Sequence, residues 1–352
     1  MKRCKKKLSI CIPSHLPLEG SRHTIESALH LNRFHSFEVI VSDNSKDPEK
    51  KRIYEPQSSA TFRFIDSGFD DPMENWNEAL RNASGDYICF LSDDDQLVAL
   101  PGFDASNCEV SAGAIGFRPT MACYTERDGV HRLTNFGVQG SKAIDRVNSY
   151  LTQHGGVNTT LFSFFESRLI KTVYDEMRSF HPYNNGYSDW AWVLGLISTG
   201  PLISNPSLLY LYNNRNWSTN EDIERNVTRT FTDAGLPKEA AFVLPLLLAL
   251  DSLGVICRAS SPVEIDEKRD AGLFAVEAFF QNFVWRLKDA ATDGGVINRK
   301  LKIARELVND SSTTIDKLAA SLLITEQWIP GARDAYLSYY RKMLTPGIIG
   351  HL

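Results

Sequence analysis

Three consecutive aspartates, Asp93, Asp94 and Asp95, follow the apolar run YICFL after a single serine. Side chains two positions apart in an extended segment point the same way, so Asp93 and Asp95 could face one cation or its ligand while Asp94 points elsewhere. Carboxylate oxygens suit both Mg²⁺ and Mn²⁺, and the residue types do not distinguish the two ions. Taken alone, the three residues are more typical of a solvated turn. Their surroundings must decide between the two interpretations.

Polar residues also stand at the ends of two earlier apolar runs. Ser14 and His15 follow the first run, and Asp43 and Asn44 follow the core of the second. Ligands of open parallel sheets bind outside the carboxyl ends of the strands. One polar strand end is ordinary loop chemistry, but three at one sheet edge predict a binding site.

The first hundred residues alternate between two periodicities, which predicts an α/β fold with a mainly parallel sheet and right-handed crossovers. Near-continuous apolar runs are expected for strands covered on both faces. The expected strands are residues 8–13, 37–43, 61–67 and 86–92, and the expected helices are residues 21–31 and 73–85.

The rest of the chain is predicted to change from mixed to helical structure near Trp217. Residues 102–153 have no clear periodicity. Beyond them we expect a strand leading into a helix at 157–170, a helix at 187–200, a strand at 206–214, and helices at 240–256, 273–287 and 332–344. We therefore predict two domains, residues 1–217 and a smaller helical domain at 218–352. The apolar run at 240–256 is shorter than the roughly 20 residues of a membrane span and is interpreted as a buried helix.

Composition excludes some classes of protein. The chain has 352 residues, 43% of them hydrophobic, and a net charge of −5. This charge argues against a nucleic-acid-binding protein, which usually has a basic surplus. The six cysteines show no C-x-x-C spacing, which argues against a zinc site and a disulfide framework and favours a reducing, cytoplasmic compartment.

The N-terminal KRCKKK is the one strongly basic segment, and no signal peptide follows it. It is either a solvated tail or a means of peripheral attraction to anionic lipid at the inner face of a membrane.

Four segments occur in an order that resembles the successive blocks of a family 2 glycosyltransferase with the A-type, nucleotide-diphospho-sugar transferase fold. They are LSICIPSH, FEVIVSDNSKD, NWNEALRNASGDYICFLSDDDQL and GYSDWAW. The resemblance is close over residues 8–100, loose over 158–216, and absent in the C-terminal third. It implies a Rossmann-like mixed, mainly parallel sheet, and inverting transfer of a sugar from a nucleotide-diphospho-sugar donor to an acceptor hydroxyl.

The resemblance also implies roles for individual residues. It places the donor nucleotide against Pro13, Ser14, His15, Asp43, Asn44, Asn77, Asp93 and Asp94. Asp93-x-Asp95 matches the D-x-D motif, whose last member, Asp95, would bind the divalent metal together with Asp93. Such a cation stabilises the negative charge that grows on the departing nucleoside diphosphate.

Asp189 matches the carboxylate that acts as general base in inverting members of the family. A carboxylate that opens the apolar helix DWAWVLGLI could also simply cap it, so both roles stay open. His154, Asn158 and Arg215 are further candidates for contacts to the acceptor or the diphosphate.

The sequence departs from the family pattern at two positions. Trp76 stands where many members have arginine, and Ser188 stands where glutamate usually precedes the base. These departures leave open a degenerate sugar-nucleotide-binding or scaffold protein. A sugar-nucleotide pyrophosphorylase is disfavoured, because PSHLPLEGSRH has a single glycine where such enzymes have a glycine-rich loop with a basic residue.

The acceptor is expected, from the resemblance, to be a carbohydrate or lipid-linked precursor of a bacterial surface polysaccharide. The C-terminal helices could bind a lipid-linked acceptor or a second copy of the chain. Their aromatic residues, Tyr336, Tyr339 and Tyr340, fit such docking or the completion of a core.

Overall fold

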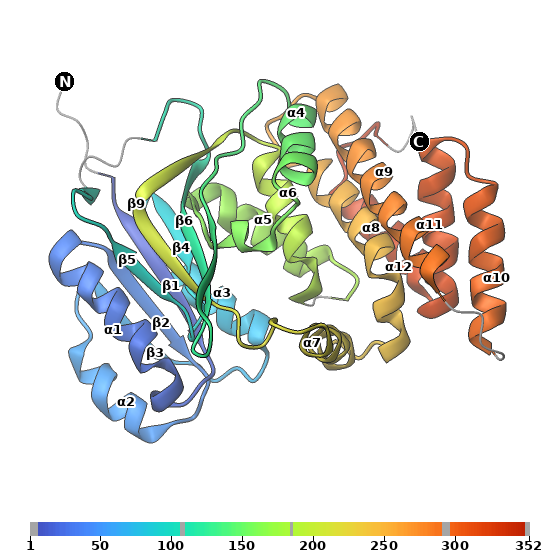
Figure 1. The fold of residues 1–352 in the computed structure, drawn as a ribbon. Helices are drawn as coiled ribbons and strands as arrows, with labels where there is room; N and C mark the ends of the chain where they lie inside the picture. The colour runs from blue at the N-terminus through green and yellow to red at the C-terminus, as the bar shows by residue number, and fades with distance from the viewer. Residues whose placement is uncertain (1–5, 106–109, 184–185, 291–295, 349–352) are drawn as a thin grey trace. The chain divides into compact units, whose positions relative to one another are not determined.

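The computed structural model describes residues 6–105, 110–183, 186–290 and 296–348 (Figure 1). Two compact units alternate along the chain. Unit 1 comprises residues up to 138, 159–174 and 201–220; unit 2 comprises residues 139–158, 175–200 and those from 221 onward. These units are not the two continuous segments expected from a single boundary at residue 217. The difference arises because helices α4 (Ala143–Asn148) and α6 (Asp189–Ile197) pack against helices of unit 2, namely α9 (Ile265–Asp289) and α8 (Leu244–Ile256).

One nine-stranded sheet forms the centre of unit 1 among the described residues. Its order is β3-β2-β1-β4-β8-β6-β9-β5, with β7 paired to β6. The strands are β1 (Leu8–Ser14), β2 (Glu38–Asp43), β3 (Phe62–Asp66), β4 (Tyr87–Phe90), β5 (Gln96–Ala99), β6 (Gly116–Thr125), β7 (Gly129–Thr134), β8 (Phe164–Glu166) and β9 (Leu202–Asn213). Strands β1 to β4 are parallel. On the other side of β4, β8 is antiparallel to both β4 and β6, β9 is parallel to β6, and β5 is antiparallel to β9. The predicted mixed, mainly parallel α/β sheet is confirmed.

The helices of unit 1 cover both faces of this sheet. Every residue of β1 and β2 is buried, which explains their continuous apolar sequences. Ile10 and Ile12 of β1 share a core cluster with Ile25 of α1 (Leu18–His35), whereas the Sγ of Cys11 lies 3.4 Å from the carbonyl oxygen of Ala79 in α3 (Pro72–Asn82). Because neighbouring strand residues point to opposite faces, α1 and α3 lie on opposite sides of β1.

Local sequence signals set where two of these helices begin. Asp47 caps α2 (Pro48–Tyr54) by accepting the backbone N–H groups of Glu49 and Lys50. Asp71 caps α3 in the same way, and a proline occupies the first turn of each helix. A short 3-10 helix, η1 (Glu55–Gln57), leads from α2 towards β3.

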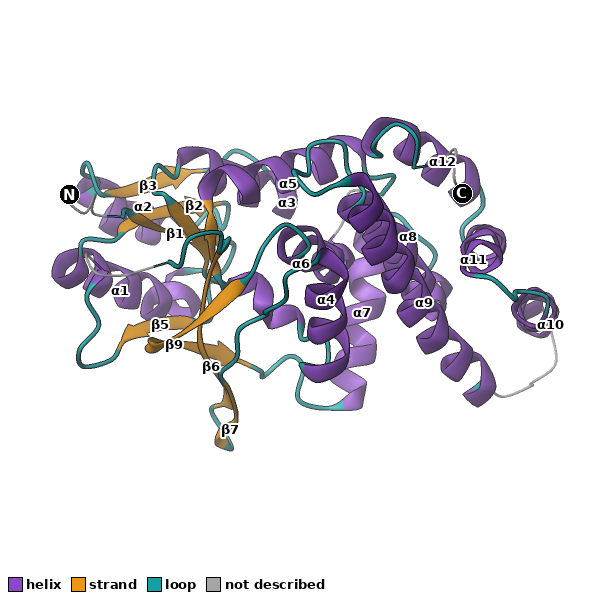
Figure 2. Cartoon of the chain, turned by 90° about the horizontal axis from the view of Figure 1, so that it is seen from above, coloured by secondary structure: helices purple, strands orange, loops and turns teal. Residues whose placement is uncertain are grey.

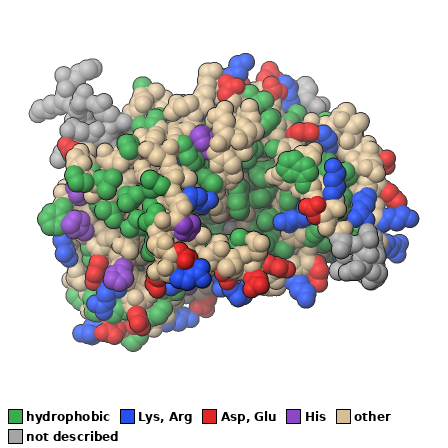
Figure 3. Space-filling model, viewed as in Figure 1, with side chains coloured by type: hydrophobic (Ala, Val, Ile, Leu, Met, Phe, Trp, Pro, Cys, Tyr) green, Lys and Arg blue, Asp and Glu red, His purple; other side chains and the backbone are tan. Residues whose placement is uncertain are grey.

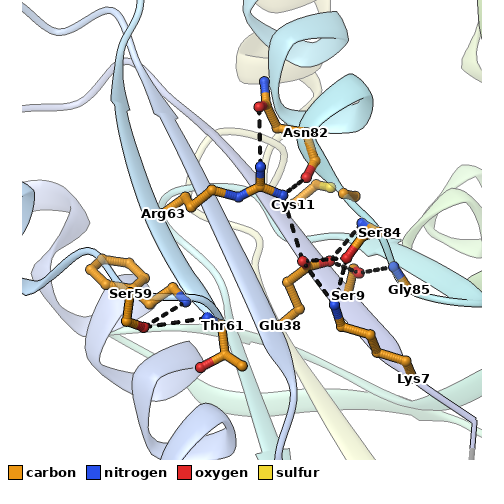
Figure 4. A network of polar contacts seen from close by, with 12 residues as sticks. Lys7, Ser9, Cys11, Glu38, Ser59, Thr61, Arg63, Asn82, Ser84 and Gly85 are labelled. Carbon is orange, nitrogen blue, oxygen red and sulfur yellow. Dashed lines mark hydrogen bonds and ion pairs between the residues drawn. The ribbon is translucent and has the colours of Figure 1, made fainter.

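A buried polar network joins the amino-terminal ends of β1 and β2 (Figure 4). Glu38 accepts hydrogen bonds from the hydroxyls of Ser9 and Ser84, from the Ser84 backbone N–H and from Lys7 Nζ. Arg63 Nη2 lies 3.5 Å from the same carboxylate. Burial by itself would raise the pKa of Glu38, but the hydrogen bonds from Ser84 and Ser9 outweigh it and lower the pKa to about 2.

The segment without clear periodicity contains β6 and β7, and β6 is a central strand. β7 is largely exposed, including Val130 and Leu133, and Figure 2 shows it projecting at the far end of β6. On the face shown in Figure 3, acidic and basic side chains are interspersed over the surface.

Unit 2 is helical in its described part. Besides α4, α6, α8 and α9 it contains most of α7 (Asn220–Asp233), all of α10 (Val296–Asn309), α11 (Thr314–Trp328) and α12 (Ala332–Met343), the end of α5 (Ser167–Phe180), and the short helices η3 (Ser149–Gln153), η5 (Gly186–Ser188) and η6 (Lys238–Val243). Tyr336, Tyr339 and Tyr340 are buried, so these tyrosines complete a core.

Helix α8 is the buried helix expected from its apolar sequence. Every residue from Pro245 to Ile256 is buried. Among the described residues, the helical stretch Lys238–Ile256 is long and apolar enough to cross a membrane, but 72% of its most apolar window is buried, as in the core helix of a folded domain. Lys2, Arg3 and Lys5 of the basic N-terminus lie outside the described residues.

Candidate functional site

Strand register brings three of the predicted polar strand ends together in unit 1. Ser14 pairs with Asp43 across β1 and β2. Cys11 pairs with Phe90 across β1 and β4, so continuation of that register by three residues places Ser14 beside Asp93. The Ser14 hydroxyl accordingly donates a hydrogen bond of 3.1 Å to Asp93 Oδ2. The convergence expected for a parallel sheet is therefore observed.

Asp93 holds the loop between β1 and α1. Its Oδ2 accepts the backbone N–H groups of His15 and Leu16, both at 2.7 Å, in addition to the Ser14 hydroxyl. The residue is 3% exposed. A carboxylate that accepts several hydrogen bonds on one oxygen fixes the backbone around it, so Asp93 shapes this loop.

Asp95 holds the end of β9. Its Oδ2 accepts the Tyr210 hydroxyl at 2.8 Å, and its Oδ1 accepts the Asn213 backbone N–H at 2.7 Å. Burial and the charge of Asp94 nevertheless raise the pKa of Asp95 well above its usual value. Asp93 and Asp95, the two aspartates expected to face a metal, thus accept hydrogen bonds from other residues of the protein.

Asp94 is the most accessible of the three aspartates. Its side chain is 21% exposed and lies 3.7 Å from Nη2 of Arg215, whose side chain is 45% exposed. Burial and the neighbouring Asp93 raise the pKa of Asp94, while Arg215 opposes this shift. No group of three or more His, Cys, Asp or Glu side chains in the described structure could hold a metal ion. A cation at Asp94 would therefore need oxygen ligands from a bound phosphate or water.

Lys50 is a residue of this cluster that sequence reasoning missed. It is fully buried on α2, and its Nζ donates to Asp43 Oδ1 at 2.5 Å, to the Ser14 hydroxyl and to the Leu16 carbonyl oxygen. The lysine thus joins the ends of β1 and β2. In the sequence it resembles its half-exposed neighbour Lys51, so only the α2 packing distinguishes the two.

The other predicted nucleotide-binding residues differ in accessibility. The His15 side chain is 70% exposed, with Nδ1 3.4 Å from Asp93 Oδ2. Pro13 is buried within β1. Asn44 donates to the Phe69 carbonyl oxygen.

Helix α3 contributes a second connection that sequence reasoning missed. Asn75 accepts the Ser42 hydroxyl and donates to the Ser14 carbonyl oxygen. Two positions further on, Asn77 is buried, and its Oδ1 has no hydrogen-bond partner among the described residues. Trp76, which stands where the family often has arginine, packs against Phe90, and the centroids of the two rings are 4.4 Å apart.

Asp189 belongs to unit 2 and begins α6. Its Oδ2 accepts a hydrogen bond of 2.8 Å from Asn158 Nδ2, and its Oδ1 accepts the backbone N–H of Trp190. Burial outweighs these hydrogen bonds and raises the pKa of Asp189 to about 7. The contact to Trp190 gives Asp189 a role at the helix start, and its pKa also suits a general base at neutral pH.

Comparisons with known proteins agree with this architecture. Residues 9–98 match the model of glycosyl transferase family 2. A crystal structure of S. aureus TarS residues 1–349 in complex with UDP-GlcNAc has a TM-score of 0.51 and 13% identity, covering 95% of this chain and 89% of that one. A longer TarS structure has a TM-score of 0.50 and 13% identity, covering 95% of this chain and 54% of that one. These two likenesses show the fold.

A search of curated proteins found no match. The family match covers the β1–β5 region, which contains the strand-end aspartates. Over these residues the chain matches family 2 glycosyltransferases, and over the rest the comparisons show the fold alone.

Proposed function

We propose that this chain is an inverting, metal-dependent glycosyltransferase that transfers a sugar from a nucleoside-diphosphate donor to an acceptor hydroxyl. The observation that carries the proposal is the acidic strand-end cluster of unit 1. In that cluster, Asp93 and Asp95 support the backbone, while Asp94 keeps an accessible carboxylate.

The proposed donor is a uridine-diphosphate sugar. The resemblance assigns Asp43 to the base or ribose, and a carboxylate paired with an ammonium group is a hydrogen-bond acceptor. Such an acceptor favours a base edge that presents an imino N–H, as uracil does. The related fold of TarS has been determined with UDP-GlcNAc. Pro13, Ser14, His15, Asn44 and Asn77 remain the proposed surroundings of the nucleotide.

The proposed metal ion is Mn²⁺ or Mg²⁺, held by Asp94 and the donor diphosphate. This choice replaces the expected pair Asp93 and Asp95, whose oxygens accept hydrogen bonds within the protein. When bound, the cation would stabilise negative charge on the leaving diphosphate. Arg215, beside Asp94, is proposed to contact the same diphosphate and to compensate for the arginine absent at Trp76.

Asp189 is the proposed general base. The acceptor oxygen attacks the anomeric carbon, the bond from that carbon to the diphosphate oxygen breaks, and the hydroxyl proton passes to an Asp189 carboxylate oxygen. The products are the inverted glycoside and the nucleoside diphosphate. A positioned base typically contributes a factor of about 10² to 10⁴ to such a step.

The acceptor is proposed to be a carbohydrate or lipid-linked carbohydrate of bacterial surface polysaccharide synthesis. The reaction is proposed to take place in the cytoplasm, with peripheral membrane contact through the basic N-terminus. Association of two copies through the C-terminal helices is a further proposal. Depletion of the protein from solution by anionic vesicles tests the membrane contact. The molecular mass of the protein in solution tests the association of two copies.

Two measurements test the function. Thermal unfolding with UDP and UDP-sugars, with and without Mn²⁺, should show metal-dependent stabilisation of about 2.7 kcal/mol at 100 times the dissociation constant. Release of UDP should then require an acceptor from a carbohydrate panel. Binding with no turnover on any acceptor would instead support a degenerate sugar-nucleotide-binding protein. Pyrophosphate release from UTP and a sugar phosphate would support a pyrophosphorylase.

A further inference from the structure

A carboxylate lies in the middle of the most apolar helix of unit 2. Asp251 is fully buried in α8, whose sequence is LPLLLALDSLGVI. Burial of a carboxylate costs several kcal/mol unless donors surround it. The proposed mechanism does not involve Asp251, so its place requires another explanation.

Three side chains donate hydrogen bonds to Asp251. The Ser188 hydroxyl donates to Oδ2 at 2.9 Å, His181 Nε2 lies 2.9 Å from Oδ1, and the Tyr336 hydroxyl donates to Oδ1 at 2.7 Å. Because the backbone N–H of Tyr183 donates to Nδ1 of His181, the ring proton belongs on Nε2, facing Asp251. Both carboxylate oxygens therefore accept from buried donors.

These contacts hold the turn directly before Asp189. Ser188 ends η5, and Asp189 is the first residue of α6. The preceding residue, Tyr187, is buried and stacks its ring on Phe231 with centroids 5.0 Å apart. The turn is thus fixed at two successive side chains, and Ser188 connects it to α8.

The group of serine, histidine and aspartate has the composition of a nucleophilic triad but lacks its geometry. In a triad, the aspartate and the serine contact different nitrogens of the imidazole ring. Here Asp251 and Ser188 both lie near His181 Nε2, at 2.9 and 3.4 Å. The ring cannot relay a proton between them in this arrangement, and the Ser188 side chain is buried. The cluster is therefore structural.

We propose that Asp251 is a positioning residue that, through the Ser188 hydroxyl, sets the place of the base Asp189. The inference rests on the proposed function. Glutamate usually stands before the base in the resembling family. Here Ser188 stands at that position, and its hydroxyl donates a hydrogen bond to the carboxylate of Asp251 in a different helix. Loss of this hydrogen bond releases the turn that carries Asp189, and small displacements of a catalytic group reduce turnover strongly.

Ser188→Ala tests the inference, with Ser252→Ala as its matched control. Ser252 is the next residue of α8, equally buried, and its hydroxyl has no hydrogen-bond partner among the described residues. Ser188→Ala should lower kcat about 10- to 100-fold and shift the pH midpoint of kcat/KM, with the UDP dissociation constant unchanged. Ser252→Ala should leave kcat and the midpoint unchanged. Asp251→Asn keeps one acceptor oxygen, so its kcat should lie between those of the wild type and Ser188→Ala.

A folded Ser188→Ala protein with wild-type kcat and midpoint would overturn the inference. Equal losses in Ser188→Ala and Ser252→Ala, with no shift of the midpoint, would also overturn it, because they would indicate general loosening of the core. If Asp189→Asn keeps full turnover, the base assignment fails and the inference fails with it. Failure of the inference alone can be distinguished from failure of the base assignment. In that case Asp189→Asn would be inactive while Ser188→Ala has normal kcat.

Discussion

The side-chain amide of Asn158 donates a hydrogen bond of 2.8 Å to the carboxylate of Asp189, although 31 positions separate the two residues in the sequence. Burial raises the pKa of Asp189, and this hydrogen bond opposes the rise because it stabilises the ionised form. The resulting pKa of about 7 makes Asp189 able to accept a proton at neutral pH.

Asp189→Asn should lower kcat by about 10² to 10⁴ and leave the dissociation constant for UDP and Mn²⁺ unchanged. The substitution removes the proposed base but no group proposed to bind the donor. Because the pKa of Asp189 is higher in the folded than in the unfolded state, its ionisation destabilises the fold as the pH rises towards 7. The melting temperature of Asp189→Asn at pH 8 should therefore match or exceed that of the wild type. Normal turnover in this variant would disprove the base assignment.

The pH dependence of kcat/KM should have a limb that rises with a midpoint near 7. Below the midpoint Asp189 is protonated and cannot accept the acceptor's proton, so the rate should fall about tenfold per pH unit. Asn158→Ala removes the donor that stabilises the carboxylate and should move the midpoint upward. Thr152→Ala, at an exposed position of the same segment, should not move it. An unchanged midpoint in Asn158→Ala would contradict this account.

Asp94→Asn should abolish the Mn²⁺ dependence of UDP binding with little change in melting temperature. Its carboxylate is the accessible one at the strand-end cluster. Asp93→Asn should instead lower the melting temperature, because Oδ2 of Asp93 accepts three hydrogen bonds from the loop between β1 and α1. Calorimetric titration of UDP with and without Mn²⁺ separates the two effects. Metal-dependent binding that survives Asp94→Asn would return the metal to Asp95 or Asp93.

Lys50→Met should lower the free energy of unfolding by about 3 to 5 kcal/mol, because it leaves the buried Asp43 carboxylate without its ammonium partner. Lys51→Met is the matched control on the same helix. Its ion pair with Asp66 is exposed to water, so its loss should change stability little. Denaturant titration measures both. Addition of Asp43→Asn to Lys50→Met should recover part of the lost stability, and no recovery would count against a charge effect.

Glu38→Gln should lower the free energy of unfolding by about 2 kcal/mol at pH 7, because its hydrogen bonds involve a charged acceptor. The pKa of Glu38 is lowered from 4.5 to about 2 by folding. Its stabilising effect is therefore fully present above about pH 4.5 and is lost as the pH falls towards 2. The difference between wild type and variant should shrink between pH 5 and 3 in denaturant titrations. A constant difference would indicate a packing effect.

The strands and helices of the first hundred residues could be predicted because their patterns are local. β1 to β4 and α1 and α3 all occur where periodicity placed them. Residues 102–153 could not be assigned. The segment contains β6, which is antiparallel to β8 and parallel to β9. Such pairing depends on residues far along the chain. The interleaved units escaped prediction for the same reason.

The amino-acid sequence by itself determined the alternation of strands and helices, and with it the sheet edge at which Ser14, Asp43 and the three aspartates meet. Periodic burial is a property of short segments and can be read without knowledge of long-range contacts. Tertiary structure decided what each carboxylate does. Asp93 and Asp95 accept hydrogen bonds from distant backbone, Asp94 stays accessible, and Asp251 bonds to the turn before Asp189. Identical side chains acquire these different roles because burial and hydrogen-bond donors come from segments that only the fold brings together.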